Sequence, residues 1–160
     1  MIKITILDND ESFIDIHDGE VHWSNLFEFN AILTFAYGDN GKCEFETMHH
    51  FMLIESMCEG ILNLLLQQKQ SSYSDFGKTS DNKLAFKIKN HDVNITVHPS
   101  KGENTLAKTT PKVLALDFLR VLKNLKKLYL SYRMDDLCDT ELKALDHYFQ
   151  SISKALSKIS

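Results

Sequence analysis

Residues 84–97 read LAFKIKNHDVNITV, and the fold class follows from the pattern of this stretch. Apolar side chains alternate with polar ones on both sides of a polar turn, which is the spacing of strands with one buried face. A turn centred on Asn90 and His91 sets Lys89 opposite Asp92, an attractive cross-strand pair. The same register pairs the apolar residues as Ile88 with Val93, Phe86 with Ile95, and Leu84 with Val97. The stretch therefore predicts an antiparallel hairpin.

The N-terminal part of the chain carries further strand patterns. Alternating isoleucines over residues 2–6 predict a first strand. The pair Asp18 and Gly19 is favoured in two-residue turns and predicts a second hairpin, which pairs Ile16 with Val21, Ile14 with Trp23, His17 with Glu20, and Asp15 with His22. A long strand is expected over residues 27–37, followed by a turn and a short strand over residues 42–46. Together these elements predict an antiparallel meander.

Helical periodicity begins near Thr47, where apolar residues recur every three or four positions up to Leu65. Residues 67–82 are polar and are interpreted as a loop. Thr110 followed by Pro111 is typical of a helix start, and Asp139 is expected to cap a last helix. We expect an α+β fold in which an antiparallel β-sheet of about six strands, in two to three hairpins, packs against three helices. A chain of 160 residues fits a single domain, residues 1–160.

The charge of the chain is unevenly distributed. Residues 1–60 hold twelve acidic and two basic residues, a net charge of −10, whereas the remaining residues hold 16 basic and ten acidic ones, a net charge of +6. A negative field attracts basic proteins and repels nucleic acids and anionic membranes. The predicted partner is therefore a basic protein, with neither nucleic acid nor membrane.

The sequence gives no signal for export or membrane insertion. The N-terminus alternates like a strand, and the most apolar stretch, residues 51–66, contains Glu55, Glu59 and Asn63. Cys43, Cys58 and Cys138 are widely spaced and are interpreted as reduced thiols without a cofactor. These features favour a cytoplasmic location.

No established catalytic motif stands out, so the chain is not expected to be an enzyme. The sequence lacks a glycine-rich phosphate loop, a nucleophile elbow and a zinc-protease helix motif. His49 and His50 are adjacent at a strand–helix junction and are interpreted as a partly exposed helix start. An alternative function depends on the polar face of the first predicted hairpin, which would serve as a metal-binding or enzymatic site built from Asp15, His17, Glu20 and His22.

The chain resembles, in general pattern, the immunity proteins that neutralise bacterial polymorphic or contact-dependent toxins. The resemblance rests on the acidic run over residues 8–20, the predicted turns at Asn40-Gly41 and Asp18-Gly19, the reduced cysteines and the lack of a catalytic motif. It implies a non-catalytic inhibitor that captures a basic toxin, for example a nuclease, through an acidic surface. The candidate contact residues are Asp8, Asp10, Glu11, Asp15, Asp18, Glu20, Glu44 and Glu46.

A further alternative is a structural domain that forms a homodimer through its C-terminal helices. The second-last predicted helix has more apolar residues than one buried stripe needs, and the additional ones include Leu116, Leu119 and Leu130. A second subunit could cover them.

Overall fold

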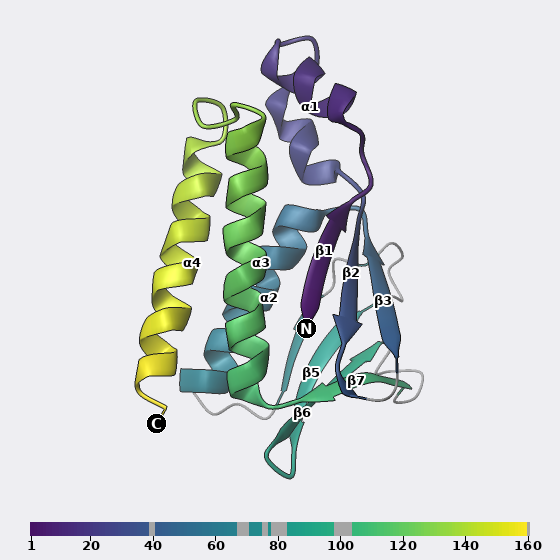
Figure 1. Cartoon of the computed structure of the whole chain (residues 1–160), viewed down its shortest axis with the longest axis vertical. Coiled ribbons are helices and arrows are strands. Elements are labelled where there is room, and N and C mark those ends of the chain that lie inside the picture. The colour runs from purple at the N-terminus through teal and green to yellow at the C-terminus, as the bar shows by residue number, and fades with distance from the viewer. Residues whose placement is uncertain (39–40, 67–70, 75–76, 78–82, 98–103, 160) are drawn as a thin grey trace.

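The computed structural model describes residues 1–38, 41–66, 71–74, 77, 83–97 and 104–159. The chain has an α+β fold, as the sequence predicted, with antiparallel strands packed against α-helices (Figure 1). The strands form two sheets, with the orders β1-β2-β3 and β4-β5-β6-β7. The elements are β1 (Ile2–Ile6), α1 (Asp10–His17), the 3₁₀ helix η1 (Trp23–Glu28), β2 (Ala31–Ala36), β3 (Lys42–Thr47), α2 (His50–Leu66), β4 (Ser71–Ser74), β5 (Leu84–Lys89), β6 (Asp92–Val97), β7 (Asn104–Thr109), α3 (Pro111–Ser131) and α4 (Asp139–Ser157).

The hairpin of β5 and β6 has the predicted register. Ile88 pairs with Val93, Phe86 with Ile95, Leu84 with Val97, and Lys89 with Asp92. The two turn residues both have positive φ, 52° at Asn90 and 70° at His91, which is the backbone of a type I′ turn. The alternation and the turn therefore determine the same pairing.

The predicted first hairpin is wrong, because residues 10–17 form helix α1. The side chain of Asn9 caps this helix by accepting a hydrogen bond from the backbone N–H of Ser12 at 3.0 Å, and Phe13 and Ile16 bury its inner face. Gly19, at φ 80°, follows the helix end and donates its N–H to Ile16 at 3.1 Å. Positive φ suits glycine after a helix as well as in a hairpin turn, so the Asp18-Gly19 pair alone does not distinguish them.

Two other expected boundaries shift. The long strand expected over residues 27–37 is replaced up to residue 28 by η1, and only Ala31–Ala36 is strand. His22 begins η1, and its ring nitrogen accepts a hydrogen bond from the N–H of Ser24 at 3.2 Å. The expected loop over residues 67–82 contains β4, which pairs with β5; residues 67–70, 75–76 and 78–82 lie outside the described part.

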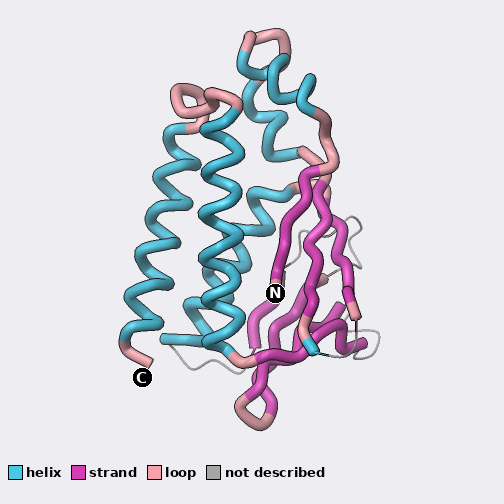
Figure 2. The backbone as a smooth tube through the Cα atoms, viewed as in Figure 1, coloured by secondary structure: helices cyan, strands magenta, loops and turns pink. Residues whose placement is uncertain are grey.

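Helices α2, α3 and α4 lie together on one side of the strands, and α1 and η1 lie beyond one end of them (Figure 2). Thr110 caps α3 through the N–H of Val113, at 3.3 Å, and α3 and α4 run antiparallel. Helix α2 contacts α3, α4 and β4, whereas α4 packs on α2 and α3. The main core joins these layers through fully buried side chains such as Phe35, Phe45, Phe86 and Phe118.

Candidate protein-binding surface

Helix α1 holds several of the predicted contact residues on its outer side. Asp10 and Glu11 occupy its first turn, where carboxylates are favoured by the partial positive charge of the helix N-terminus. Their side chains are exposed, as are those of Asp18 and Glu20 beyond the helix, while Asp15 is half-buried. Since the inner face of α1 is apolar, the helix directs these acids to solvent.

Aromatic contacts hold α1 against the rest of the molecule. The ring of Phe13 stacks on Tyr132 at a centroid distance of 4.4 Å, and it meets the edge of Phe29 at 5.0 Å. The hydroxyl of Tyr132 also donates a hydrogen bond to the carboxylate of Asp10. Because Tyr132 directly follows α3, these contacts bring α1 next to the turn between α3 and α4.

That turn adds acidic residues of its own. Asp135 and Asp136 are exposed, and the turn lies with α1 and η1 at one end of the long axis of the molecule (Figure 1). We call this region the acidic end, defined by Asp10, Glu11, Asp15, Asp18, Glu20, Asp135 and Asp136.

The acidic end is only weakly compensated by positive charge. The carboxylate of Asp18 lies 3.0 Å from the Nδ1 atom of His17. In the described part of the chain, none of the carboxylates of the acidic end forms an ion pair with a lysine or arginine. Arg133 lies nearby and lines, with His17 and Asp18, a shallow pocket of about 310 Å³ between α1 and the end of α3. Most of the negative charge of the acidic end is therefore not neutralised by a neighbouring positive side chain.

Three of the eight predicted contact residues lie apart from this cluster or have a local role. The carboxylate of Asp8 accepts a hydrogen bond from the backbone N–H of Asn30 at 2.9 Å, which joins the start of α1 to the start of β2. Glu44 and Glu46 are exposed on one face of β3. The structure thus brings together Asp10, Glu11, Asp15, Asp18 and Glu20, and separates them from the two β3 residues.

Lysines gather at the opposite end of the long axis. Helix α3 begins there and α4 ends there (Figure 1), which places Lys112 in the first turn of α3 and Lys154 and Lys158 around the end of α4. All three side chains are exposed. The charge asymmetry seen along the sequence is therefore also an asymmetry along the molecule.

The cross-strand face that supported the metal or enzymatic alternative is not formed. Asp15 and His17 are two positions apart on a helix, so their side chains point in different directions. His22 instead caps η1 and contacts the hydroxyl of Ser24 at 2.8 Å. Across the described residues, no three His, Cys, Asp or Glu side chains are arranged to hold a metal ion.

His50 is a buried polar residue whose environment the sequence did not predict. It was expected to be partly exposed, yet it is fully buried. Its Nε2 lies 2.6 Å from the hydroxyl of Tyr129 and its Nδ1 lies 3.2 Å from the carbonyl of Phe29. Burial lowers the pKa of His50 to about 4, so the ring is neutral near pH 7. Because His50 and Tyr129 are 79 positions apart, no local pattern could signal the pair.

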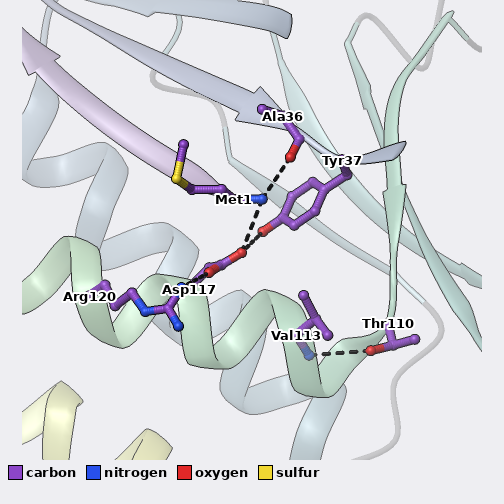
Figure 3. A network of polar contacts seen from close by, with 7 residues as sticks. All are labelled: Met1, Ala36, Tyr37, Thr110, Val113, Asp117 and Arg120. Carbon is purple, nitrogen blue, oxygen red and sulfur yellow. Dashed lines mark hydrogen bonds and ion pairs between the residues drawn. The ribbon is translucent and has the colours of Figure 1, made fainter. Parts of the chain in front are cut away.

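The buried carboxylate of Asp117 forms the centre of a second polar network (Figure 3). This carboxylate accepts a hydrogen bond from the hydroxyl of Tyr37 at 2.7 Å and forms an ion pair with Arg120 at 2.7 Å. The amino group of Met1 lies 3.2 Å from the same carboxylate and donates to the carbonyl of Ala36 at 2.8 Å. Burial and the adjacent carboxylate raise the pKa of Tyr37. The network ties β1 and β2 to α3, and the i,i+3 spacing of Asp117 and Arg120 was its one local signal.

Two of the three cysteines are buried in surroundings that disfavour the thiolate. Cys43, Cys58 and Cys138 are free thiols, and the last two are buried. Burial raises the pKa of Cys138 to about 12 and also raises the pKa of Cys58. Since the thiolate is the reactive form, both side chains are poor nucleophiles near pH 7.

Within the residues that the structure describes, no helix combines the length and the apolar character that crossing a bilayer requires. Searches against protein-family models, curated proteins and solved structures found no match for this chain.

Proposed function

We propose that this chain is a non-catalytic binding protein of the immunity type, which neutralises a basic toxin, such as a nuclease, through its acidic end. One observation carries the proposal. Carboxylates from α1, from the residues after it and from the α3–α4 turn lie at the same end of the molecule, without an ion pair to lysine or arginine among the described residues. A surface of this kind speeds association with a positively charged partner.

The proposed site of action is the cytoplasm. The three cysteines are unpaired, which supports a reducing compartment. A toxin that enters or is made in the same cell would meet its inhibitor there.

The proposal is tested by producing this chain together with the protein encoded by the gene immediately upstream. If that protein is a basic toxin, we expect this chain to restore growth of cells that produce it and to copurify with it. An acidic upstream product, or a basic toxin that this chain neither binds nor neutralises, contradicts the proposal.

A matched pair of variants locates the contact surface. The changes Glu11→Gln and Glu20→Gln remove two exposed charges from the acidic end, and Glu44→Gln and Glu46→Gln remove two exposed charges from β3. We expect the first pair to slow association with the toxin more than the second. Equal effects would show that net charge, and not the acidic end, governs binding.

The homodimer alternative receives less support from the surface of α3. Leu116 and Leu130 are exposed by 44% and 46%, but they lie 14 positions apart, about 21 Å along a helix. The exposed side chains of Lys123 and Lys127 lie between them in the chain. Leu119 packs partly against the core. Size-exclusion chromatography with light scattering tests this alternative, and a monomer at high concentration is the expected result.

A further inference from the structure

A groove between α2 and α4 combines apolar and acidic walls. One hollow of this groove has a volume of about 280 Å³ and is lined by Phe51, Met52, Glu55, Thr140, Glu141 and Ala144. A second hollow of about 250 Å³ shares Met52 and Glu55 with the first, and its other lining residues are Ser56, Glu59 and Tyr148. The two hollows share a wall and together form one groove with three carboxylates and, among the described residues, no lysine or arginine in its lining.

Glu141 is the most unusual residue of this groove. Its side chain is 9% exposed, and among the described residues it has no hydrogen-bond or ion-pair partner. It lies in the first turn of α4, where the partial positive charge of the helix N-terminus favours a carboxylate. Its position in the groove lining leaves its charge available to a cation from a partner.

The other two carboxylates make the groove still more favourable for positive charge. Burial and the negative charges of Glu59 and Glu141 raise the pKa of Glu55. The carboxylate of Glu59 accepts a hydrogen bond from the hydroxyl of Tyr148 at 3.1 Å. A cation between these residues would relieve their mutual repulsion.

The walls select a cation with an apolar stem. Met52 is 43% exposed, and it lines the groove with Phe51 and Ala144. An arginine side chain presents methylene groups to such a surface, and its planar group can stack on aromatic rings and offers five donors to several carboxylates.

We propose that this groove receives an arginine side chain from a basic segment of a partner protein. The inference rests on the proposed function, since it names the chemistry by which the basic toxin would be held. The N-terminal half of α4 that lines the groove follows directly from the α3–α4 turn of the acidic end. A segment drawn to the acidic end can therefore reach the groove without crossing the molecule.

The test titrates the intact chain with N-acetyl-arginine amide and follows its backbone amide signals by NMR. We expect saturable shifts at Met52, Glu55, Glu141 and Ala144, with weaker binding of the lysine analogue and none of the uncharged citrulline analogue. Equal binding of citrulline, tighter binding of lysine, or no saturable shift in the groove overturns the inference.

Variants separate the groove from general electrostatic attraction. The double change Glu55→Gln and Glu141→Gln should weaken arginine binding by about tenfold, because charge-assisted hydrogen bonds are lost. The matched change Glu44→Gln and Glu46→Gln on β3, outside the acidic end, should leave it within about twofold. Equal losses in the two variants would overturn the assignment to the groove. Circular dichroism confirms that each variant is folded.

This experiment needs no partner protein, so its failure differs from failure of the proposed function. If arginine binds the groove but the upstream toxin is neither bound nor neutralised, the immunity function is wrong. If the toxin is neutralised and its binding is indifferent to Glu55→Gln and Glu141→Gln, the groove assignment is wrong.

Discussion

His50 and Asp117 show how single polar residues stabilise this fold from within. Each lies in the core and contacts groups from distant parts of the chain. Buried polar groups stabilise a structure when they are hydrogen-bonded, and loss of one partner leaves the other without compensation. Both residues therefore give predictions about stability rather than about binding.

Changing Asp117→Asn should destabilise the protein by roughly 1–3 kcal/mol. The change removes the negative charge that pairs with Arg120 and the amino group of Met1, and weakens the acceptor for Tyr37. Urea unfolding measures the loss. Asp92→Asn is the control, because Asp92 pairs with exposed Lys108 near the surface and should cost less than about 1 kcal/mol. Equal losses of unfolding free energy in the two variants would contradict a larger contribution from the buried carboxylate of Asp117.

His50 should make stability fall in acid. Its pKa is about 4 in the folded chain and 6.5 ordinarily, so protons bind the unfolded chain more readily. The stability that neutral His50 contributes is present above about pH 6.5 and is lost as the pH falls towards 4, by on the order of 3 kcal/mol in all.

Unfolding free energies of the natural chain and of His50→Gln, measured from about pH 7 to about pH 4, test this expectation. The variant should be less stable at pH 7, because Tyr129 and Phe29 lose their partner. Its stability should nevertheless fall less steeply in acid. Parallel pH profiles would mean that His50 does not titrate in this range.

Among the elements, the hairpin of β5 and β6 was predictable and α1 was not. In the hairpin, two alternating stretches and an ion pair agree on one register. In residues 10–19, an Asn cap, a first turn of acids and two apolar residues three apart compete with a turn signal that serves either structure. The burial of Phe13 against Tyr132 and Phe29 favours the helix, and the contact with Tyr132 joins residues more than a hundred positions apart.

The same limit applies to the candidate surface. The acids of residues 10–20 were predictable as a group because they are close in sequence. Their association with Asp135 and Asp136 depends on the docking of α1 beside the α3–α4 turn. The groove of Glu55 and Glu141 depends on the packing of α2 against α4, for which neither helix carries a local signal.

The turn of the β5–β6 hairpin gives a prediction at the level of the element. His91 has φ 70° and is exposed, a backbone conformation that strains residues with a Cβ atom. His91→Gly should therefore stabilise the protein by about 0.5–1 kcal/mol, measured by thermal or urea unfolding. His91→Ala is the control, since it removes the ring but keeps the strain, and it should give no gain. A gain in both variants would assign the effect to the imidazole.

For the whole molecule, the separation of acids and lysines predicts how binding depends on salt. The association rate with a basic partner should fall steeply as ionic strength rises, because the acidic end acts over distances that salt screens. Stopped-flow kinetics at several salt concentrations measure this slope. Reversing two charges, Glu11→Lys and Glu20→Lys, should flatten the slope and leave the dissociation rate less affected. An unchanged slope would argue against steering by this end.

The opposed ends of the long axis have a consequence that does not require any partner. Negative charge at one end and positive charge at the other give the molecule an electric dipole moment along its long axis. At the pH where its net charge is zero, the protein should still be retained by both anion and cation exchangers. The anion exchanger would bind the acidic end, and the cation exchanger would bind the opposite end. In the field of a basic protein, this dipole moment favours orientations in which the acidic end faces the partner before contact.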